Sequence, residues 1–229
     1  MPGFSLTFDV SPYRLTGTVV GALLNHAPQL AALGEAVHQP PYRAAPVAPV
    51  LAIKPRNTLA LDGAAIEVPA GVAALEICAS LGIVIGRTAC RVPRAAALDW
   101  VGGYTIVNDV SVPQASHYRP AVRFKARDGF CPIGPRVVAA REIAAPDALQ
   151  VNVLIEGRIA QRSNTGERVR GVAQLIADVT DFMTLLPGDV LMLGVAAGAP
   201  QAHAGQSVSI TIEGLGSLNN RLVATGERA

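Results

Sequence analysis

The chain has 229 residues, of which 50% are hydrophobic and 16% are charged. This length suits one domain of ordinary to large size, with or without a short N-terminal extension, and argues against two full domains. Nineteen basic and seventeen acidic residues give a net charge of +2 without any basic run, so nucleic-acid binding is not expected.

The N-terminal residues lack a secretory signal pattern, and no apolar run reaches the roughly 18 residues of a membrane span. We therefore expect no membrane segment and no export. The three cysteines, Cys78, Cys90 and Cys131, show neither CxxC spacing nor a paired framework. This favours free thiols in a reducing compartment and predicts a cytoplasmic protein.

The first 45 residues alternate poorly and are rich in proline near their end, which predicts a leading strand and an irregular arm. We place the main domain at residues 46–229. Short apolar or alternating runs predict its strands. They cover residues 50–53, 81–86, 104–110, 190–193 and 208–212, with a hairpin around 151–158. A brief helix is expected over residues 94–101.

One segment has a clear helical period. Between Val169 and Met183 the apolar residues recur at steps of three and one, and the pattern stops before the turn at Pro187-Gly188. Together the elements predict a β-rich α+β domain with one long helix.

The chain lacks several familiar catalytic motifs. There is no G-x-S-x-G elbow, and Gly214-Leu215-Gly216 lacks the third glycine of a dinucleotide site, so a turn is the better interpretation. The four histidines are scattered without the spacing of a zinc cluster.

Two features of the sequence leave the chemistry open. Glu76 and Asp109 flank predicted strands, where each is either a functional carboxylate or an ordinary hydrogen-bonding group. Residues 117–129 carry four cations and one carboxylate. Crowded cations suit the capture of a small molecule rich in carboxylates, because lysine and arginine donate charge-assisted hydrogen bonds. A solvated strand face is the alternative.

Six segments, taken in order, resemble the fumarylacetoacetate hydrolase-like family. They are residues 54–58 (KPRNT), 81–86 (LGIVIG), 103–111 (GYTIVNDVS), 118–120 (YRP), 125–135 (KARDGFCPIGP) and 182–189 (FMTLLPGD). The resemblance runs from about residue 18 to the C-terminus. It implies the fold of the family's C-terminal domain, a mixed β-sandwich or roll with one long helix.

Within the family, residues 125–134 and the early stretch from Leu24 to Tyr42 look most like the N-terminal half of the bifunctional isomerase/decarboxylase of 4-hydroxyphenylacetate breakdown. That resemblance implies isomerisation of 2-hydroxyhepta-2,4-diene-1,7-dioate and decarboxylation of 5-carboxymethyl-2-oxo-hex-3-ene-1,6-dioate, with Mg²⁺ or Mn²⁺. It assigns catalytic roles to Lys125 and Asp109. It assigns substrate binding to Tyr118, Arg119, Arg123 and Lys54.

The sequence departs from the family pattern at the metal site. Active members place a Glu-x-Glu pair before the buried strand, and alignment puts Cys78 and Ser80 at these positions, leaving Asp109 as the matching ligand. Glu76 reaches the site only if the strand slips by two residues, which keeps its side chain on the same face. Hard cations prefer oxygen ligands, so we expect metal binding by this chain alone to be weak or absent.

Two further departures concern the lid and a late turn. The lid positions of a family His and Glu correspond to Gln29 and Ala32, and a Thr-Gly-Thr-Pro turn is replaced by residues 193–196 (LGVA). We therefore expect an enzyme subunit acting on a 2-oxo dicarboxylate, as a homodimer or as a heterodimer with a metal-competent partner half. The alternatives are an inactive structural or dicarboxylate-binding protein, and another family reaction such as acylpyruvate hydrolysis or oxaloacetate decarboxylation.

Overall fold

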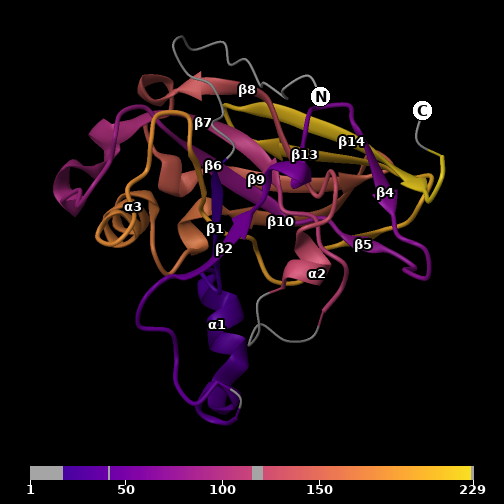
Figure 1. Cartoon of the computed structure of the whole chain (residues 1–229), viewed down its shortest axis with the longest axis horizontal. Coiled ribbons are helices and arrows are strands. Elements are labelled where there is room, and N and C mark those ends of the chain that lie inside the picture. The colour runs from indigo at the N-terminus through magenta and orange to yellow at the C-terminus, as the bar shows by residue number, and fades with distance from the viewer. Residues whose placement is uncertain (1–17, 41, 115–120, 228–229) are drawn as a thin grey trace.

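The computed structural model of the chain describes residues 18–40, 42–114 and 121–227. Strands dominate it, and they form a seven-stranded sheet, a five-stranded sheet and a two-stranded pair (Figure 1). The seven-stranded sheet has the order β2 (Val50–Lys54), β1 (Val19–Leu23), β11 (Val190–Met192), β6 (Ala79–Ile85), β7 (Val101–Asn108), β8 (Cys131–Ala139) and β3 (Leu59–Ala60).

The seven-stranded sheet curls, because its two edge strands are close neighbours in the chain. β2 ends at Lys54 on one edge, and β3 begins at Leu59 on the other edge. Only residues 55–58 join them, so the two edges must approach each other. This curl brings the end of β2 to the same place as the end of β7.

The second sheet is almost entirely antiparallel. Its order is β10 (Arg158–Asn164), β9 (Gln150–Ile155), β13 (Ser207–Ile212), β14 (Gly216–Ala224) and β4 (Ala65–Val68). A small pair joins β12 (Gln201–Ala202) to β5 (Leu75–Glu76). The described α-helices are α1 (Ala27–Leu33), α2 (Val122–Lys125) and α3 (Val172–Thr180).

Both faces of the central strand β6 are buried, which explains why it reads as a continuous apolar run. One face packs on the second sheet and α3 through alternate residues such as Ile83 of β6 and Ile106 of β7. The opposite, inner face carries the residues between them, such as Val84 and Val107. Successive side chains of a strand point to opposite faces, so Asp109, just beyond β7, falls in line with the inner face.

The structure confirms the β-rich α+β fold class and the sites of its main strands. The helix predicted from Val169 to Met183 is present but shorter, because it starts after Gly171 and ends at Thr180. Its expected final turn leaves Phe182 66% exposed instead of buried. The segment Arg94–Trp100 is a 3₁₀-helix, and β7 starts and ends a few residues earlier than expected.

The hairpin expected near residue 156 is present between β9 and β10. Glu156 and Gly157 both adopt positive φ, as a two-residue hairpin turn of type I′ requires. The leading strand is β1, and it lies inside the seven-stranded sheet; the domain boundary at residue 45 stays a prediction. None of the helices in the described ranges combines the length and the apolar character needed to cross a bilayer.

Candidate active site at the end of the curled sheet

Two lysines and one aspartate meet at the end of the inner face. Asp109 follows β7, Lys54 ends β2, and Lys125 ends the short helix α2. All three residues are buried. The site therefore depends on the curl of the sheet, which carries Lys54 from one edge to the strand that precedes Asp109.

The carboxylate of Asp109 is shared between the two ammonium groups. Lys54 Nζ donates to Oδ1 at 2.9 Å, and Lys125 Nζ donates to Oδ2 at 2.7 Å. Lys54 also donates to the backbone carbonyl of Lys125 at 2.8 Å, and Lys125 to that of Asp109 at 3.3 Å. Each ammonium has three donors, so each keeps one donor beyond these bonds. The Lys54 side chain is 1% exposed and that of Lys125 is 10% exposed, so Lys125 is the more accessible of the two.

The charges hold one another in their ionised forms. Burial alone would raise the pKa of Asp109, but attraction to Lys125 and Lys54 outweighs it and lowers that pKa. Burial alone would lower the pKa of Lys125, but the Asp109 carboxylate outweighs it and raises that pKa. Two cations around one carboxylate leave the group with a net positive charge, which favours an anion as its ligand.

Cys78 and Ser80 lie beside this group on the inner face of the β6 end, and neither is a carboxylate substitute. Burial raises the pKa of the Cys78 thiol to about 12, so the thiol is neutral at pH 7. The Ser80 hydroxyl donates to the Leu81 carbonyl at 3.2 Å and accepts from the Gly194 amide at 3.1 Å. Its hydrogen-bonding capacity is directed at the backbone.

Glu76 is a further carboxyl group that interacts with Lys125 and Asp109 through its charge. It belongs to β5, pairs through its backbone with Ser111, and is half-buried. Burial raises its pKa, the Lys125 cation lowers it and the Asp109 anion raises it, with a net upward shift. These influences place Glu76 in the electrostatic field of the two lysines and Asp109, but no hydrogen bond joins it to them.

The residues present do not fit a resident Mg²⁺ or Mn²⁺ ion. Both Asp109 oxygens accept from ammonium groups, and Cys78 supplies a neutral thiol where a hard cation prefers oxygen. Within the described residues, no group of three or more His, Cys, Asp or Glu side chains is placed to hold a metal ion. A divalent cation would also add charge to a site that is already positive.

The described cations of the segment 117–129 are Arg123, Lys125 and Arg127, and they do not converge on one group. Tyr118 and Arg119 lie outside the described residues. Arg123 is exposed on α2, and its carbonyl accepts from Arg127 Nε at 3.0 Å. Of these three described cations, Lys125 alone donates to Asp109. The predicted substrate-binding roles of Lys54, Tyr118, Arg119 and Arg123 stay predictions.

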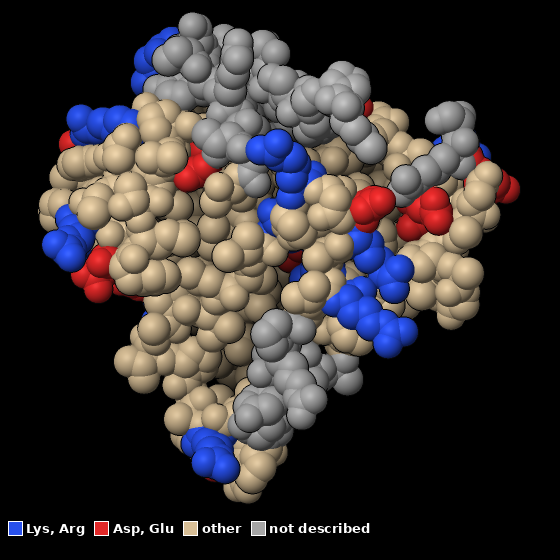
Figure 2. Space-filling model, in the orientation of Figure 1, with Lys and Arg blue, Asp and Glu red and all other residues tan. Residues whose placement is uncertain are grey.

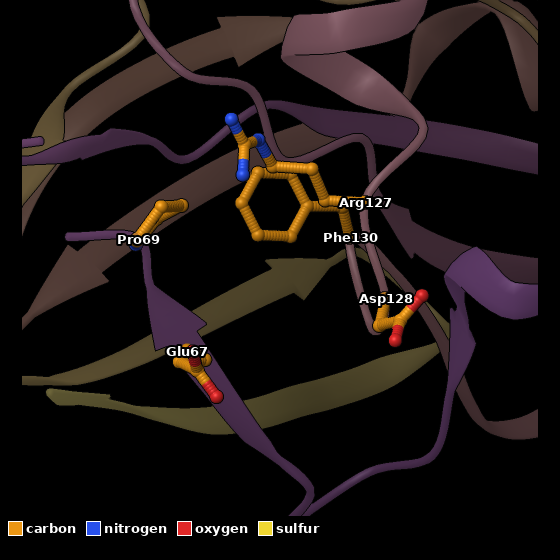
Figure 3. Close-up of a pocket in the computed structure, with 5 residues that line it drawn as sticks. All are labelled: Glu67, Pro69, Arg127, Asp128 and Phe130. Atoms are coloured by element: carbon orange, nitrogen blue, oxygen red, sulfur yellow. The ribbon is translucent and has the colours of Figure 1, made fainter. Parts of the chain in front are cut away.

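Arg127 instead lines a separate open pocket of about 280 Å³ (Figure 3). Arg127, Asp128 and Phe130 form one side, while Glu67 and Pro69 at the end of β4 form the other. Asp128 accepts a hydrogen bond from the Asn57 side-chain amide at 2.8 Å. The pocket does not include the two lysines or Asp109.

Sequence reasoning missed a buried histidine at the start of α1. His26 Nδ1 accepts from the backbone amides of Gln29, at 3.3 Å, and Ala197, at 3.2 Å. Its Nε2 lies 3.5 Å from a carboxylate oxygen of Glu167. His26 thus connects α1 to the loop after β11, whose Gly194 amide contacts Ser80. The sequence does carry one signal for this role. A proline near the start of a helix marks the residue before the helix as its N-cap, and His26 fills that position.

This histidine predicts a dependence of stability on pH. Burial and the Arg168 cation lower the His26 pKa from its ordinary value of 6.5, and Glu167 offsets them only in part. The folded state therefore binds the proton less readily than the unfolded chain. The stabilisation by neutral His26 is complete above about pH 6.5 and is lost as the pH falls toward the lowered pKa.

The test compares the chain with the variant His26→Asn, because asparagine keeps a helix-capping acceptor but does not titrate. Urea denaturation over a pH series is expected to show a steeper loss of unfolding free energy below pH 6.5 for the unmodified chain. Parallel curves for the two proteins would show that His26 does not control this loss.

Residues 18–223 match the family model of the fumarylacetoacetate (FAA) hydrolase C-terminal domain. The chain belongs to the fumarylacetoacetate hydrolase family. The 4-hydroxyphenylacetate degradation bifunctional isomerase/decarboxylase of Salmonella dublin is 40% identical over 215 residues, which cover 94% of this chain and 49% of that protein. The Escherichia coli protein of the same name is 39% identical over 209 residues, with 91% and 48% coverage. The chain thus spans about half the length of these relatives.

Solved structures of the fumarylacetoacetate hydrolase fold match most of the chain. The 5-carboxymethyl-2-hydroxymuconate delta-isomerase of Mycobacterium smegmatis has a TM-score of 0.79 at 33% identity, covering 93% of this chain and 81% of that one. The fumarylpyruvate hydrolase of Pseudomonas aeruginosa, in complex with Mn²⁺ and pyruvate, has a TM-score of 0.82 at 23% identity, covering 98% and 97%. The second likeness concerns the fold alone.

Proposed function

We propose that this chain is the metal-poor half of an isomerase/decarboxylase that acts on 2-oxo dicarboxylates in 4-hydroxyphenylacetate breakdown. The reactions are isomerisation of 2-hydroxyhepta-2,4-diene-1,7-dioate and decarboxylation of 5-carboxymethyl-2-oxo-hex-3-ene-1,6-dioate. A partner half with a complete set of carboxylates holds the divalent cation. The proposed compartment is the cytoplasm, whose reducing conditions suit the free thiols Cys78, Cys90 and Cys131.

The observation that carries the proposal is the occupation of both Asp109 oxygens by Lys54 and Lys125. Identity near 40% to named isomerase/decarboxylases supports the pathway. Cys78 and Ser80 stand where active members of the family have carboxylates, which supports the assignment of metal binding to the partner half. Relatives about twice as long as this chain have room for such a second half in the same polypeptide.

The site favours the binding of a carboxylate at Lys125. Its ammonium has a third donor beyond the two bonds to Asp109, and this donor can bond to an anionic oxygen, while the charge of Lys54 adds attraction. A fixed cation in a partly dry site stabilises an oxygen on which negative charge develops, as in an enolate. Asp109 keeps both lysines charged and in place, and is a positioning residue in this proposal.

A second candidate is a binding protein for dicarboxylates that has no turnover. The enclosed Lys54 and the neutral Cys78 thiol favour it, because neither group serves proton transfer at pH 7 in the way that an exposed base does. Activity measured with a partner half distinguishes the two candidates.

The test begins with calorimetric titration of Mn²⁺ into the purified chain. We expect no tight site in this chain, and gain of a site in the double variant Cys78→Glu/Ser80→Glu, which restores two oxygen ligands. The isomerisation of 2-hydroxyhepta-2,4-diene-1,7-dioate is then followed by absorbance with and without a metal-competent partner half.

Turnover only in the presence of the partner, faster than with the partner alone, supports the enzyme subunit. Tight Mn²⁺ binding with full turnover by this chain alone would refute the metal-poor half, and would point to Glu76 and Asp109 as ligands. Binding of the dicarboxylate with no gain in turnover would favour the binding protein.

A further inference from the structure

The turn that follows Lys125 is held by one residue of the short link between β2 and β3. That residue is Asn57. Its side-chain amide donates to the Ala126 carbonyl at 3.3 Å and to Asp128 Oδ1 at 2.8 Å. Its own carbonyl accepts from the Gly129 amide at 3.1 Å. Asn57 therefore contacts the turn through three of its residues.

The helix that carries Lys125 cannot fix this side chain by itself. α2 has only four residues, and the last carbonyls of a helix have no partners inside it. The Phe124 carbonyl accepts from the Val112 amide at 3.0 Å, which fixes the helix before Lys125. The Lys125 carbonyl accepts from Lys54 Nζ at 2.8 Å. The next carbonyl, in the turn, is the one that Asn57 holds.

The backbone position of Lys125 decides where its remaining donor points. Its ammonium donates to Asp109 Oδ2 at 2.7 Å and to the Asp109 carbonyl at 3.3 Å. The three N–H bonds and the Cε–Nζ bond are arranged tetrahedrally, so the third donor follows the direction from which the side chain arrives. That direction is set by the end of α2, and hence by the turn that Asn57 holds.

The direction of this donor matters because other cations lie close by. Arg123 is exposed on α2, and Arg127 is half-buried in the turn. Figure 2 shows Lys and Arg side chains gathered on this face around the place of α2. Figure 3 shows Arg127 and Asp128 pointing away from each other on the turn. An anion drawn here by charge alone meets several cations, so a preference for Lys125 requires a donor in a fixed direction.

We propose that Asn57 is a positioning residue for Lys125. By holding the turn, it directs the free ammonium donor toward an anionic oxygen of a 2-oxo dicarboxylate. The identity of this anion rests on the proposed function, whereas the position of Lys125 is a property of the chain without any ligand. Asn57 and Asp128 are both exposed, so their contacts contribute little to folding, and positioning can be tested apart from stability.

The composition of the chain allows a direct test, because its only lysines are Lys54 and Lys125. Protein grown with ¹³C-labelled lysine gives NMR signals from these two side chains alone, and the variant Lys125→Met assigns them. A lysine fixed in an asymmetric site has different shifts for its two ε-protons, and the shifts converge when the side chain moves freely. We expect a clear separation for Lys125 in the unmodified chain and a reduced separation in Asn57→Ala.

A swap of the two polar groups provides the rescue. Asn57→Asp removes the donor and places two carboxylates opposite each other, so the separation is expected to fall at least as far as in Asn57→Ala. The double variant Asn57→Asp/Asp128→Asn exchanges donor and acceptor and keeps the net charge of the chain. We expect it to recover part of the separation, because the bond between the two positions can form again.

Asn219 provides the matched control. It is an exposed asparagine on β14, and its side-chain amide donates to a carboxylate, that of Asp62, at 3.4 Å. Asn219→Ala therefore removes a comparable surface contact in the other sheet. We expect this variant to leave the Lys125 signals unchanged.

Calorimetric titration of 2-oxoadipate connects the position of Lys125 to binding. Asn57→Ala is expected to weaken binding by roughly 3- to 10-fold, the effect of a lost hydrogen bond of ordinary strength. The same substitution is expected to cause no further weakening when Lys125 is already replaced by methionine, because the two residues act through one contact. A merely structural role would weaken binding equally in both backgrounds.

The positioning role and the proposed function can fail separately. Lys125 signals without any separation in the unmodified chain would overturn the positioning role, and so would signals that respond to neither Asn57→Ala nor Asn57→Asp. Equal weakening of binding in both backgrounds would overturn it as well. If 2-oxoadipate does not bind but the Lys125 signals respond as expected, the dicarboxylate site is refuted, and Asn57 remains the residue that fixes Lys125.

Discussion

Replacing Asp109 by asparagine is expected to lower the free energy of unfolding by about 3–5 kcal/mol, since it leaves two enclosed lysines without their counter-ion. Lys54 and Lys125 both donate to this one carboxylate, and Lys54 is 1% exposed. Removal of one member of a buried charge group costs far more than the intact group contributes, because the remaining charges cannot be hydrated. The melting temperature is expected to fall by roughly 6–20 °C.

Urea denaturation followed by circular dichroism measures this effect. The control is the triple variant Asp109→Asn/Lys54→Met/Lys125→Met, which removes the cations together with the anion. We expect it to regain much of the loss, because apolar groups of similar volume often replace buried charges at little cost. A loss below about 1 kcal/mol in Asp109→Asn would show that the lysines are hydrated or that they find other acceptors.

The Asp109 carboxylate also predicts how the stability of the fold changes at acidic pH. Lys125 and Lys54 outweigh burial and hold the pKa of Asp109 below its ordinary value. A group with a lowered pKa in the folded state stabilises the protein above its unfolded pKa, and this stabilisation is lost as the pH falls through the folded pKa. As the pH falls, the free energy of unfolding is therefore expected to decrease less in the Asp109→Asn variant than in the unmodified chain.

Replacing Lys125 by methionine is expected to weaken the binding of a 2-oxo dicarboxylate by roughly 10- to 150-fold, because a hydrogen bond to a charged group contributes about 1.5–3 kcal/mol. Lys125 is the more exposed of the two ammonium groups and keeps a donor that Asp109 does not use. Calorimetric titration of 2-oxoadipate into the two proteins measures the ratio of dissociation constants.

Arg123→Met provides the control on the same helix. Arg123 is exposed on α2, two residues before Lys125, so its removal takes away the same charge from the same neighbourhood. The two variants thus separate Lys125 from Arg123, for which substrate binding is also predicted: a site at Lys125 that does not involve Arg123 leaves binding in Arg123→Met nearly unchanged. Equal weakening in both variants would mean that the dicarboxylate responds to the overall charge of α2, and the proposed carboxylate position would then be wrong.

Much of the fold was predictable because its core strands carry strong local patterns. The run at 81–86 is apolar without interruption, as expected when both faces of β6 are buried. β14 was missed because its residues, GSLNNRLVA, mix polar and apolar side chains and include two asparagines. The helix α3 was predicted too long because Phe182 and Met183 continue the apolar period after the helix has ended.

The sequence predicted only part of the site, because residues that meet there are far apart in the chain. The resemblance to the family assigned catalytic roles to Asp109 and Lys125; these roles stay predictions, but the structure does bring the two side chains to within 2.7 Å of each other. The contact of Lys54 with Asp109 spans 55 residues, and it exists only because the sheet curls. Local patterns carry no information about such a closure. Nor do they show that Arg123 and Arg127 turn away from Lys125.

The short link between the two edges of the curled sheet has a consequence for the order of folding. Residues 55–58 join β2 to β3, so the first edge cannot detach without loosening the last. Lys54 can reach Asp109 only when both edges of the sheet are in place, and a contact that spans 55 residues carries a large cost in loop-closure entropy. We therefore expect the bond between Lys54 and Asp109 to form late in folding. A chain in which β1 and β2 have not yet docked would hold the Asp109 carboxylate without Lys54.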